Sequence, residues 1–171
     1  MHLNVEIKAR TDRQDEIRRI LLAKGADFRG TDHQTDTYFR NERGRLKLRR
    51  GNIEHSLIFY RRPDQAGPKP SEVFLYHPEQ PGEKLYELLK AAYGVWVEVR
   101  KVREIYFIGN VKFHLDTVEG LGHFVEIEAI DAEGSLGEAH IRAQCEHYVQ
   151  LFAIQPADLL EQSYSDLLAQ A

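Results

Sequence analysis

Apolar and polar residues alternate along most of this chain, and the alternation predicts strands. In residues 2–10, Val5 and Ile7 fall on one face while Glu6 and Lys8 fall on the other. Successive side chains of a strand project to opposite faces, so this segment is expected to be a strand with one apolar and one polar face. The same pattern predicts strands at about residues 28–40, 44–50, 54–62, 71–77, 95–108, 110–118 and 123–130.

Helical spacing of apolar residues interrupts this strand pattern. Before the first helix, Thr11 and Gln14 have the three-residue spacing of a capping box. Ser135 and Glu138 have the same spacing before a later helix. Helices are expected at residues 12–24, between 81 and 94, at 136–152 and, as a short tail, within 156–168, with a loop at 64–70.

Three cations share one face of the strand predicted at residues 44–50. Arg45, Lys47 and Arg49 occupy every second position, with leucines between them. If this face contacts water, the charges only keep the strand soluble. If it faces the inside of a closed sheet, three cations in a confined space require a polyanion.

Paired carboxylates occur nearer the end of the chain. Glu126 and Glu128 stand two residues apart on a predicted strand, so their side chains project the same way, about 7 Å apart. Such a pair repels unless a cation lies between its members. A hard divalent metal ion would supply that cation.

Strands with one apolar and one charged face can be arranged in two ways. An open sheet would cover its apolar side with helices and leave the charges in water. A closed antiparallel eight-stranded β-barrel would line its lumen with the charged faces and pack the helices outside. The charged faces carry both signs, which favours the closed barrel and an α+β fold. The acids on these faces are Glu6, Asp116, Glu126 and Glu128, and the cations are Arg45, Lys47, Arg49, Arg62, Lys101 and Arg103.

Composition fits one globular domain over residues 1–171, with 42% hydrophobic and 29% charged residues. The single cysteine, Cys145, excludes an intramolecular disulfide and a multi-cysteine zinc site, and is typical of a reducing, cytoplasmic setting. No apolar segment is long enough for a signal peptide or a membrane span. The formal net charge of −4 argues against a general nucleic-acid binder, so a polyanion site must be local. The sequence leaves open whether the chain forms a homodimer.

Several short motifs occur in an order typical of one family. Residues 5–8, Val-Glu-Ile-Lys, resemble the second half of the Glu-x-Glu-x-Lys signature of the CYTH family. The resemblance covers nearly the whole chain. Asn4 departs from it, because the family has its first glutamate at this position. Further resembling motifs lie at residues 36–39, 44–49, 60–63, 101–103, 124–128 and 163–168.

The resemblance implies a triphosphate tunnel and a metal-dependent enzyme that processes a triphosphate. The CYTH family includes class IV adenylyl cyclases, thiamine triphosphatases and inorganic triphosphatases. The expected cofactor is Mg²⁺ or Mn²⁺. Glu6, Lys8 and Glu126 are expected at the reacting centre. The expected metal ligands are Glu6, Asp116, Glu126 and Glu128, and the expected substrate ligands are Lys8, Arg45, Lys47, Arg49, Arg62, Lys69, Lys101 and Arg103.

The charges of these residues suit a triphosphate. With Lys8 included, seven lumen cations stand against four acids, which leaves a surplus of three positive charges. A triphosphate with one divalent ion carries about −2 overall, which this surplus would neutralise.

The residues leave the reaction itself open. Attack by a metal-polarised water on the terminal phosphorus would make a triphosphatase, whereas attack by the ribose 3′-hydroxyl of ATP on the α-phosphorus would make a cyclase that releases pyrophosphate. Hydrolysis is favoured because it needs no adenine pocket. Inorganic triphosphate, thiamine triphosphate and nucleoside triphosphates are all candidate substrates. The other classes are a non-catalytic polyphosphate or nucleotide sensor, since Asn4 weakens a second metal site, and a lipocalin-like carrier of another ligand.

Several further positions have two interpretations each. Arg62 is preferred to Arg61 for the lumen because it stands next to a proline, as the family's arginine does. Lys69 either contacts phosphate at the tunnel mouth or belongs to an ordinary loop. His114 lies on a charged face, where it either binds substrate, titrates near neutral pH or is structural. Tyr164 either closes one barrel end or packs as part of the tail.

Overall fold

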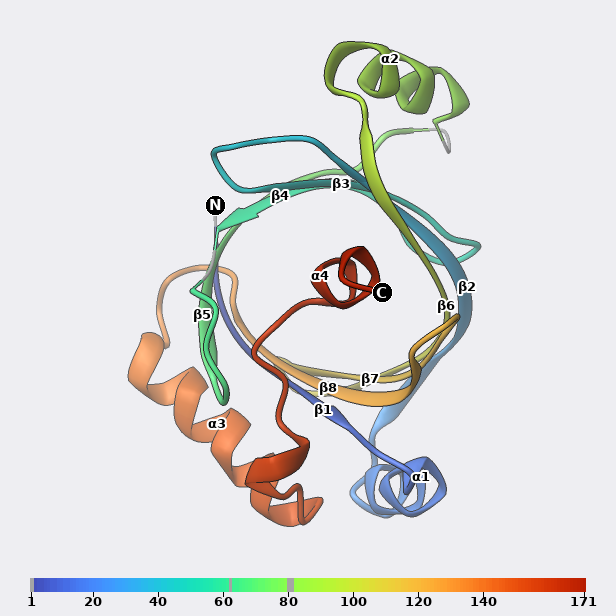
Figure 1. The fold of residues 1–171 in the computed structure, drawn as a ribbon. Coiled ribbons are helices and arrows are strands. Elements are labelled where there is room, and N and C mark those ends of the chain that lie inside the picture. The colour runs from blue at the N-terminus through green and yellow to red at the C-terminus, as the bar shows by residue number, and fades with distance from the viewer. Residues whose placement is uncertain (1, 62, 80–81) are drawn as a thin grey trace.

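The computed structural model describes residues 2–61, 63–79 and 82–171, and its strands close into one antiparallel barrel (Figure 1). The strands are β1 (His2–Arg10), β2 (Asp27–Phe39), β3 (Arg45–Arg50), β4 (His55–Arg61), β5 (Lys69–Tyr76), β6 (Val95–Ile108), β7 (Val111–Val118) and β8 (Gly122–Asp131). Their order around the barrel is β1-β5-β4-β3-β2-β6-β7-β8, and β8 pairs with β1 to close the ring. The predicted closed eight-stranded barrel is confirmed.

Three longer helices surround the barrel and a short one lies at its centre. The helices are α1 (Gln14–Ala23), α2 (Glu83–Tyr93), α3 (Glu138–Leu151), the short 3-10 helix η1 (Pro156–Asp158) and α4 (Tyr164–Ala169). Helices α1, α2 and α3 lie outside the ring of strands, whereas α4 lies within the ring as seen along the barrel axis (Figure 1). The last helix is therefore placed to cover one end of the lumen.

The apolar faces of the strands point outward and are covered by helices. Val5 and Ile7 of β1 belong to one cluster with Leu21 of α1 and Ile141 of α3, and all four side chains are at most 2% exposed. On other strands, Leu89 of α2 belongs to a second outer cluster that covers β2 and β3. Because the apolar faces are buried outside, the polar faces must enclose the lumen.

The capping box predicted before α1 does not form. The Thr11 hydroxyl accepts a hydrogen bond from the Arg13 backbone amide at 3.0 Å. Gln14 instead donates from Nε2 to the carbonyl oxygens of Asp116 and Phe124, at 2.8 and 3.1 Å. Gln14 therefore fastens the start of α1 to β7 and β8 rather than capping the helix.

A carboxylate from β8 replaces the capping box predicted before α3. Asp131 accepts hydrogen bonds from the three backbone amides of residues 135–137, at distances from 2.9 to 3.2 Å. These bonds, led by that from Gly137, stabilise the ionised carboxylate and lower the pKa of Asp131. A capping box does form at α4, between Ser163 and Asp166.

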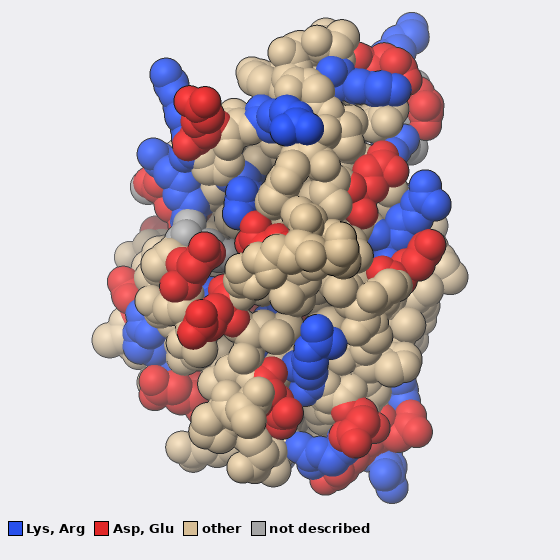
Figure 2. Space-filling view, in the orientation of Figure 1, with Lys and Arg blue, Asp and Glu red and all other residues tan. Residues whose placement is uncertain are grey.

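Both signs of charge occur on the surface. In the orientation of Figure 1, Figure 2 shows Lys and Arg interspersed with Asp and Glu, while uncharged side chains cover much of the middle of this face. This face therefore offers no broad basic patch. Among the helices within the described ranges, none is both long and apolar enough to span a membrane.

Candidate active site

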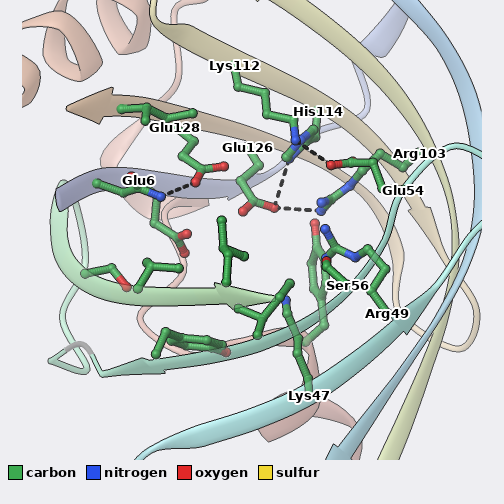
Figure 3. A pocket seen from close by; sticks show the side chains of 18 of the residues that line it. Glu6, Lys47, Arg49, Glu54, Ser56, Arg103, Lys112, His114, Glu126 and Glu128 are labelled. Carbon is green, nitrogen blue, oxygen red and sulfur yellow. Dashed lines mark hydrogen bonds and ion pairs between the residues drawn. The ribbon is translucent and has the colours of Figure 1, made fainter. Parts of the chain in front are cut away.

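A cavity of about 240 Å³ lies in the barrel lumen, and every strand contributes side chains to it (Figure 3). These side chains come from the strand positions that alternate with the outward apolar ones, as the sequence predicted. The charged faces are therefore enclosed rather than exposed to water. The charged lining consists of Glu6, Lys8, Lys47, Arg49, Glu54, Lys101, Arg103, Lys112, Glu126 and Glu128.

An arginine–aspartate pair joins β6 to β7 inside the lumen. Arg103 donates from Nε and Nη2 to the two carboxylate oxygens of Asp116, at 2.7 and 2.6 Å, and the two residues stand opposite each other in register. Nη2 also donates to Glu126 at 2.9 Å. Burial alone would lower the pKa of Arg103, but Asp116 and Glu126 outweigh it and raise that pKa. Arg103 is therefore charged at neutral pH.

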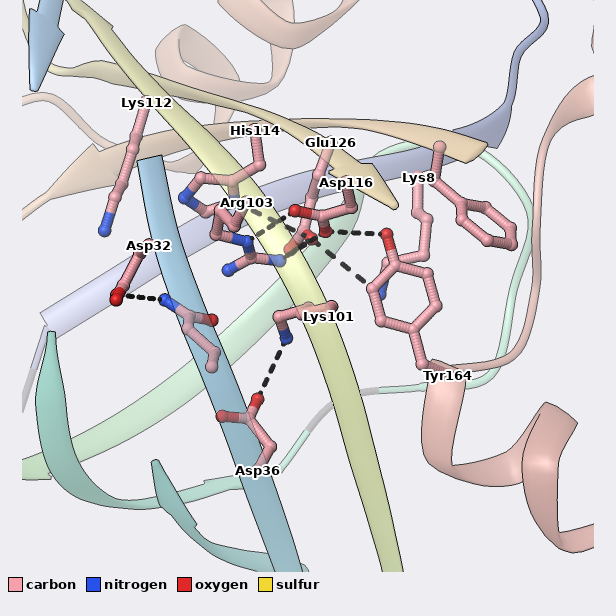
Figure 4. A network of polar contacts seen from close by, with 12 residues as sticks. Lys8, Asp32, Asp36, Lys101, Arg103, Lys112, His114, Asp116, Glu126 and Tyr164 are labelled. Carbon is pink, nitrogen blue, oxygen red and sulfur yellow. Dashed lines mark hydrogen bonds and ion pairs between the residues drawn. The ribbon is translucent and has the colours of Figure 1, made fainter. Parts of the chain in front are cut away.

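Asp36 is the centre of a second buried network, and the sequence pattern gave it no role. It accepts hydrogen bonds from Arg49 Nε and Nη2 at 2.9 and 2.8 Å. Lys101 Nζ donates to it at 3.0 Å (Figure 4), and Lys47 Nζ lies 3.6 Å away. Burial would raise the pKa of Asp36, but these cations, led by Arg49, lower it well below the usual range. The available signal was spacing, because Asp36 precedes the cavity residue Tyr38 by two positions on β2.

Tyr164 closes one end of the lumen, which is the first of its two predicted roles. Its hydroxyl donates to Asp116 at 2.8 Å, and Lys8 Nζ lies 4.0 Å from its ring centroid (Figure 4). The side chain packs against Phe124, and the residue is only 3% exposed. The charged network thus holds α4 in place over the barrel end.

Two predicted substrate ligands hold this C-terminal segment rather than line the cavity. Arg45 donates to Asp166 of α4 at 2.5 Å and lies over the ring of Trp96. Lys69 is 2% exposed and donates from Nζ to the carbonyl oxygen of Glu161. Lys69 is also the first residue of β5, so placing it in a loop is wrong.

Arg61 lies on the outer face of β4, because Tyr60 before it faces the cavity. Its Nη2 is 2.6 Å from Glu72 Oε2, and both side chains are exposed. Arg61 is therefore not a lumen residue. Arg62, the residue predicted for the lumen, lies outside the described residues.

Three of the four predicted metal ligands line the cavity together (Figure 3). Glu6 of β1 stands directly opposite Glu128 of β8, and Glu126 is two residues from Glu128 on the same face. Asp116 does not line the cavity, because the arginine and tyrosine described above hold its carboxylate. The structure therefore narrows the candidate metal ligands to three.

Their chemistry fits a hard divalent cation. Like charges placed directly opposite on neighbouring strands repel, and carboxylate oxygens are the donors that Mg²⁺ and Mn²⁺ prefer. Asn4 offsets part of the repulsion, since its Nδ2 donates to Glu128 Oε1. Among the described residues, no three His, Cys, Asp or Glu side chains are already grouped as a metal site. Metal binding would therefore require Glu6 and Glu128 to change rotamer.

The lumen also contains more acids than the sequence indicated. Glu54, between β3 and β4, accepts a hydrogen bond from Lys112 Nζ at 2.7 Å. Burial would raise its pKa, but Arg49 and Lys112 outweigh burial and lower the pKa of Glu54. Among the described residues, the cations Lys8, Lys47, Arg49, Lys101, Arg103 and Lys112 are matched by the acids Glu6, Asp36, Glu54, Asp116, Glu126 and Glu128. The expected surplus of three cations is therefore wrong.

Comparison with known families agrees with this barrel and its charged lumen. The family model of the CYTH domain matches residues 2–163. The chain belongs to the CYTH family. No curated protein matches the sequence closely enough to be counted as a relative.

Solved structures share the fold of this CYTH protein. PH1012 from Pyrococcus horikoshii has a TM-score of 0.78 at 22% identity, covering 98% of this chain and 99% of its own. A proposed adenylate cyclase from Vibrio parahaemolyticus has a TM-score of 0.78 at 20% identity, covering 98% of each chain. HpAC1 from Hippeastrum, a proposed adenylyl cyclase with a dominant triphosphatase activity, has a TM-score of 0.61 at 14% identity, covering 98% and 94%. At these identities the likeness shows the fold alone.

His114 is kept neutral by its surroundings in this CYTH barrel. The residue is 1% exposed, and its Nδ1 lies 3.7 Å from Glu126. Burial and the nearby charge of Arg103 lower the pKa of His114 to about 4, although Glu126 opposes them. The interpretation that His114 titrates near neutral pH is therefore wrong for the unliganded protein.

Lys101 loses its proton more easily than an ordinary lysine. Burial and the neighbouring Arg103 lower its pKa to about 7, and Arg49 acts in the same direction. Asp36 and Asp116 oppose this shift without cancelling it. Part of the Lys101 population is therefore neutral at physiological pH.

We predict that Asp36→Asn lowers the free energy of unfolding by about 3–5 kcal/mol, because it leaves buried cations without a counter-charge. Urea denaturation followed by circular dichroism measures the change. Glu72→Gln is the matched control, since its ion pair with Arg61 is exposed and contributes at most about 1 kcal/mol. Equal effects of the two substitutions would contradict the role assigned to Asp36.

We also predict that tripolyphosphate binding is coupled to protonation of Lys101, whose Nζ also faces the Tyr164 ring at 5.5 Å. A bound polyanion raises the lysine pKa, so at a pH about 1.5 units above its free value the protein takes up a proton on binding. Below that value Lys101 is already charged, and the uptake disappears. Calorimetry in buffers of different ionisation enthalpy measures the protons exchanged, and Lys101→Met subtracts the contribution of the ligand. Identical proton uptake by both proteins would exclude this coupling.

Proposed function

We propose that this protein is a divalent-metal-dependent enzyme that hydrolyses a phosphoanhydride bond of a triphosphate held in the barrel lumen. The observation that carries the proposal is a single cavity lined by Lys and Arg from five strands and by three carboxylates on β1 and β8. Phosphoryl transfer needs mainly alignment and electrostatic stabilisation, which such a lining can supply. Membership of the CYTH family supports the same reaction class.

Arg49 and Arg103 are placed to bind phosphate oxygens without losing their aspartate partners. Each uses its Nε and Nη2 atoms for the paired aspartate. A guanidinium has five N–H donors in a planar fork, so its remaining edge is available to the cavity. Lys8, Lys47 and Lys101 add point charges that can follow the phosphoryl group as it moves.

Glu6, Glu126 and Glu128 are the residues that would hold the metal ion. A divalent cation bound there would polarise phosphate oxygens and activate a water molecule at neutral pH. Burial would raise the pKa of Glu126, but Lys8 and Arg103 outweigh it and lower that pKa, so the carboxylate is ionised and able to act as a ligand. The positive charge of the ion would also offset the acids that balance the lumen cations.

Cyclisation of ATP is the second candidate reaction. The cavity lining includes the uncharged side chains Ile58, Val73 and Leu75, so the argument that the lumen has no place for an adenine is weaker than the sequence indicated. Hydrolysis releases orthophosphate, whereas cyclisation releases cyclic AMP and pyrophosphate. The HpAC1 comparison, in which a proposed cyclase has a dominant triphosphatase activity, supports hydrolysis as the first choice.

We predict that Glu126→Gln lowers the Mg²⁺- or Mn²⁺-dependent turnover of triphosphates by about 100-fold or more, because an amide cannot replace the carboxylate charge at the reacting centre. Phosphate release and chromatography of nucleotide products measure turnover. Glu104→Gln on the outer face of β6, where Glu104 pairs with Arg18, is the control and leaves turnover unchanged. Unchanged turnover in folded Glu126→Gln would refute the metal assignment. Thermal stabilisation of the unmodified protein by triphosphates without any product would show a sensor instead of an enzyme.

A further inference from the structure

The wall of the cavity formed by β4 and β5 differs from the rest of the lining. Its side chains are all uncharged, and they form two cross-strand pairs, Ile58 with Leu75 and Tyr60 with Val73. The pairs adjoin, so they make one continuous apolar patch inside an otherwise charged lumen. The cavity-lining residues of the two strands are Ser56, Ile58, Tyr60, Ser71, Val73 and Leu75.

The order of strands places this patch across the barrel from the most basic wall. In the ring of eight strands, β5 and β4 are separated from β7 and β6 by half of the circumference. The basic wall contributes Lys101, Arg103 and Lys112 to the cavity. The lumen is therefore two-sided, with cations on one side and apolar side chains on the other.

Packing against α4 explains only part of this patch. Ile58, Tyr60 and Val73 belong to the buried cluster that surrounds Tyr164. Leu75 is not part of that cluster and remains 45% exposed although it lines the cavity. A half-exposed leucine at the edge of a charged cavity is free to be covered by a ligand.

An inorganic triphosphate would gain nothing from such a wall. It carries charge along its whole length, and bringing it against apolar side chains would remove water from the phosphates without replacing their hydrogen bonds. An organic group attached to the triphosphate would instead bury apolar surface there, which is favourable by about 25 cal/mol per Å². The wall also lacks a carboxylate to pair with a cationic ring, so an uncharged ring is favoured.

We infer that the substrate is a nucleoside triphosphate, whose base lies against Ile58 and Leu75 while its phosphates lie along the basic wall of β6 and β7. This inference rests on the proposed function, because it assigns the substrate class of the same cavity. Leu75 then determines specificity by contact with the base, and it takes no part in the chemistry. Its replacement should change the preference for organic over inorganic triphosphate without changing the phosphate site.

The test compares the dissociation constants of ATP and tripolyphosphate, measured by calorimetry with Mg²⁺ in the intact protein. Leu75→Asn is expected to raise the ratio of the ATP constant to the tripolyphosphate constant about tenfold, the loss of roughly one buried side chain. Phe74→Asn is the matched control, because Phe74 is the neighbouring residue, is 42% exposed and packs on the outer face against Phe59. Leu75→Met keeps the apolar contact and should keep the original ratio.

The outcomes separate this inference from the proposed function. If tripolyphosphate and ATP both bind but Leu75→Asn leaves the ratio unchanged, or if Phe74→Asn changes it equally, the nucleoside assignment is overturned and the proposed function stands. If neither compound binds the unmodified protein, the proposed function fails and the nucleoside assignment fails with it. Thermal melting of each variant verifies folding, and Leu75→Thr replaces Leu75→Asn if the latter does not fold.

Discussion

The closed sheet depends on one constraint, which is that every charge enclosed in the lumen needs a partner. A buried charge without a partner costs several kcal/mol, so an apolar outside alone could not keep this barrel closed. Two arginine–aspartate pairs meet the constraint, Arg49 with Asp36 and Arg103 with Asp116, each between neighbouring strands in register. Strand register and charge pairing therefore support each other, because a shift by one residue would turn both partners to the outside.

The same network connects the barrel to the C-terminal helix. Asp116 accepts hydrogen bonds from both Arg103 and Tyr164, so one carboxylate links the phosphate-binding wall to α4. Arg45 and Lys69, which sequence alone assigned to the substrate, extend this connection to Asp166 and Glu161. Closure of one barrel end and preparation of the cavity are thus parts of a single electrostatic arrangement, which leaves the carboxylates of β1 and β8 and the apolar wall of β4 and β5 to face a ligand.

Much of the fold could be predicted because strand alternation is a local signal. The bounds of β1 and β6 agree with the predicted segments, and the charged faces were correctly assigned to the lumen. The capping boxes failed because Gln14 and Asp131 find partners that only tertiary structure brings near. Asp36 was missed for a similar reason, since its importance comes from Arg49 on the next strand and Lys101 on the other neighbour. The apolar wall was missed because its residues alternate like those of any half-buried strand.

The central claim is that the lumen binds a triphosphate with a divalent metal ion between its carboxylates and its cations. Anomalous X-ray diffraction from crystals of the protein soaked with Mn²⁺ and tripolyphosphate tests it most directly. The account predicts a manganese peak within bonding distance of Glu6, Glu126 or Glu128, with phosphate density between that peak and Arg49 or Arg103. A manganese peak outside the barrel, or phosphate bound only at the surface while the lumen stays empty, would contradict it.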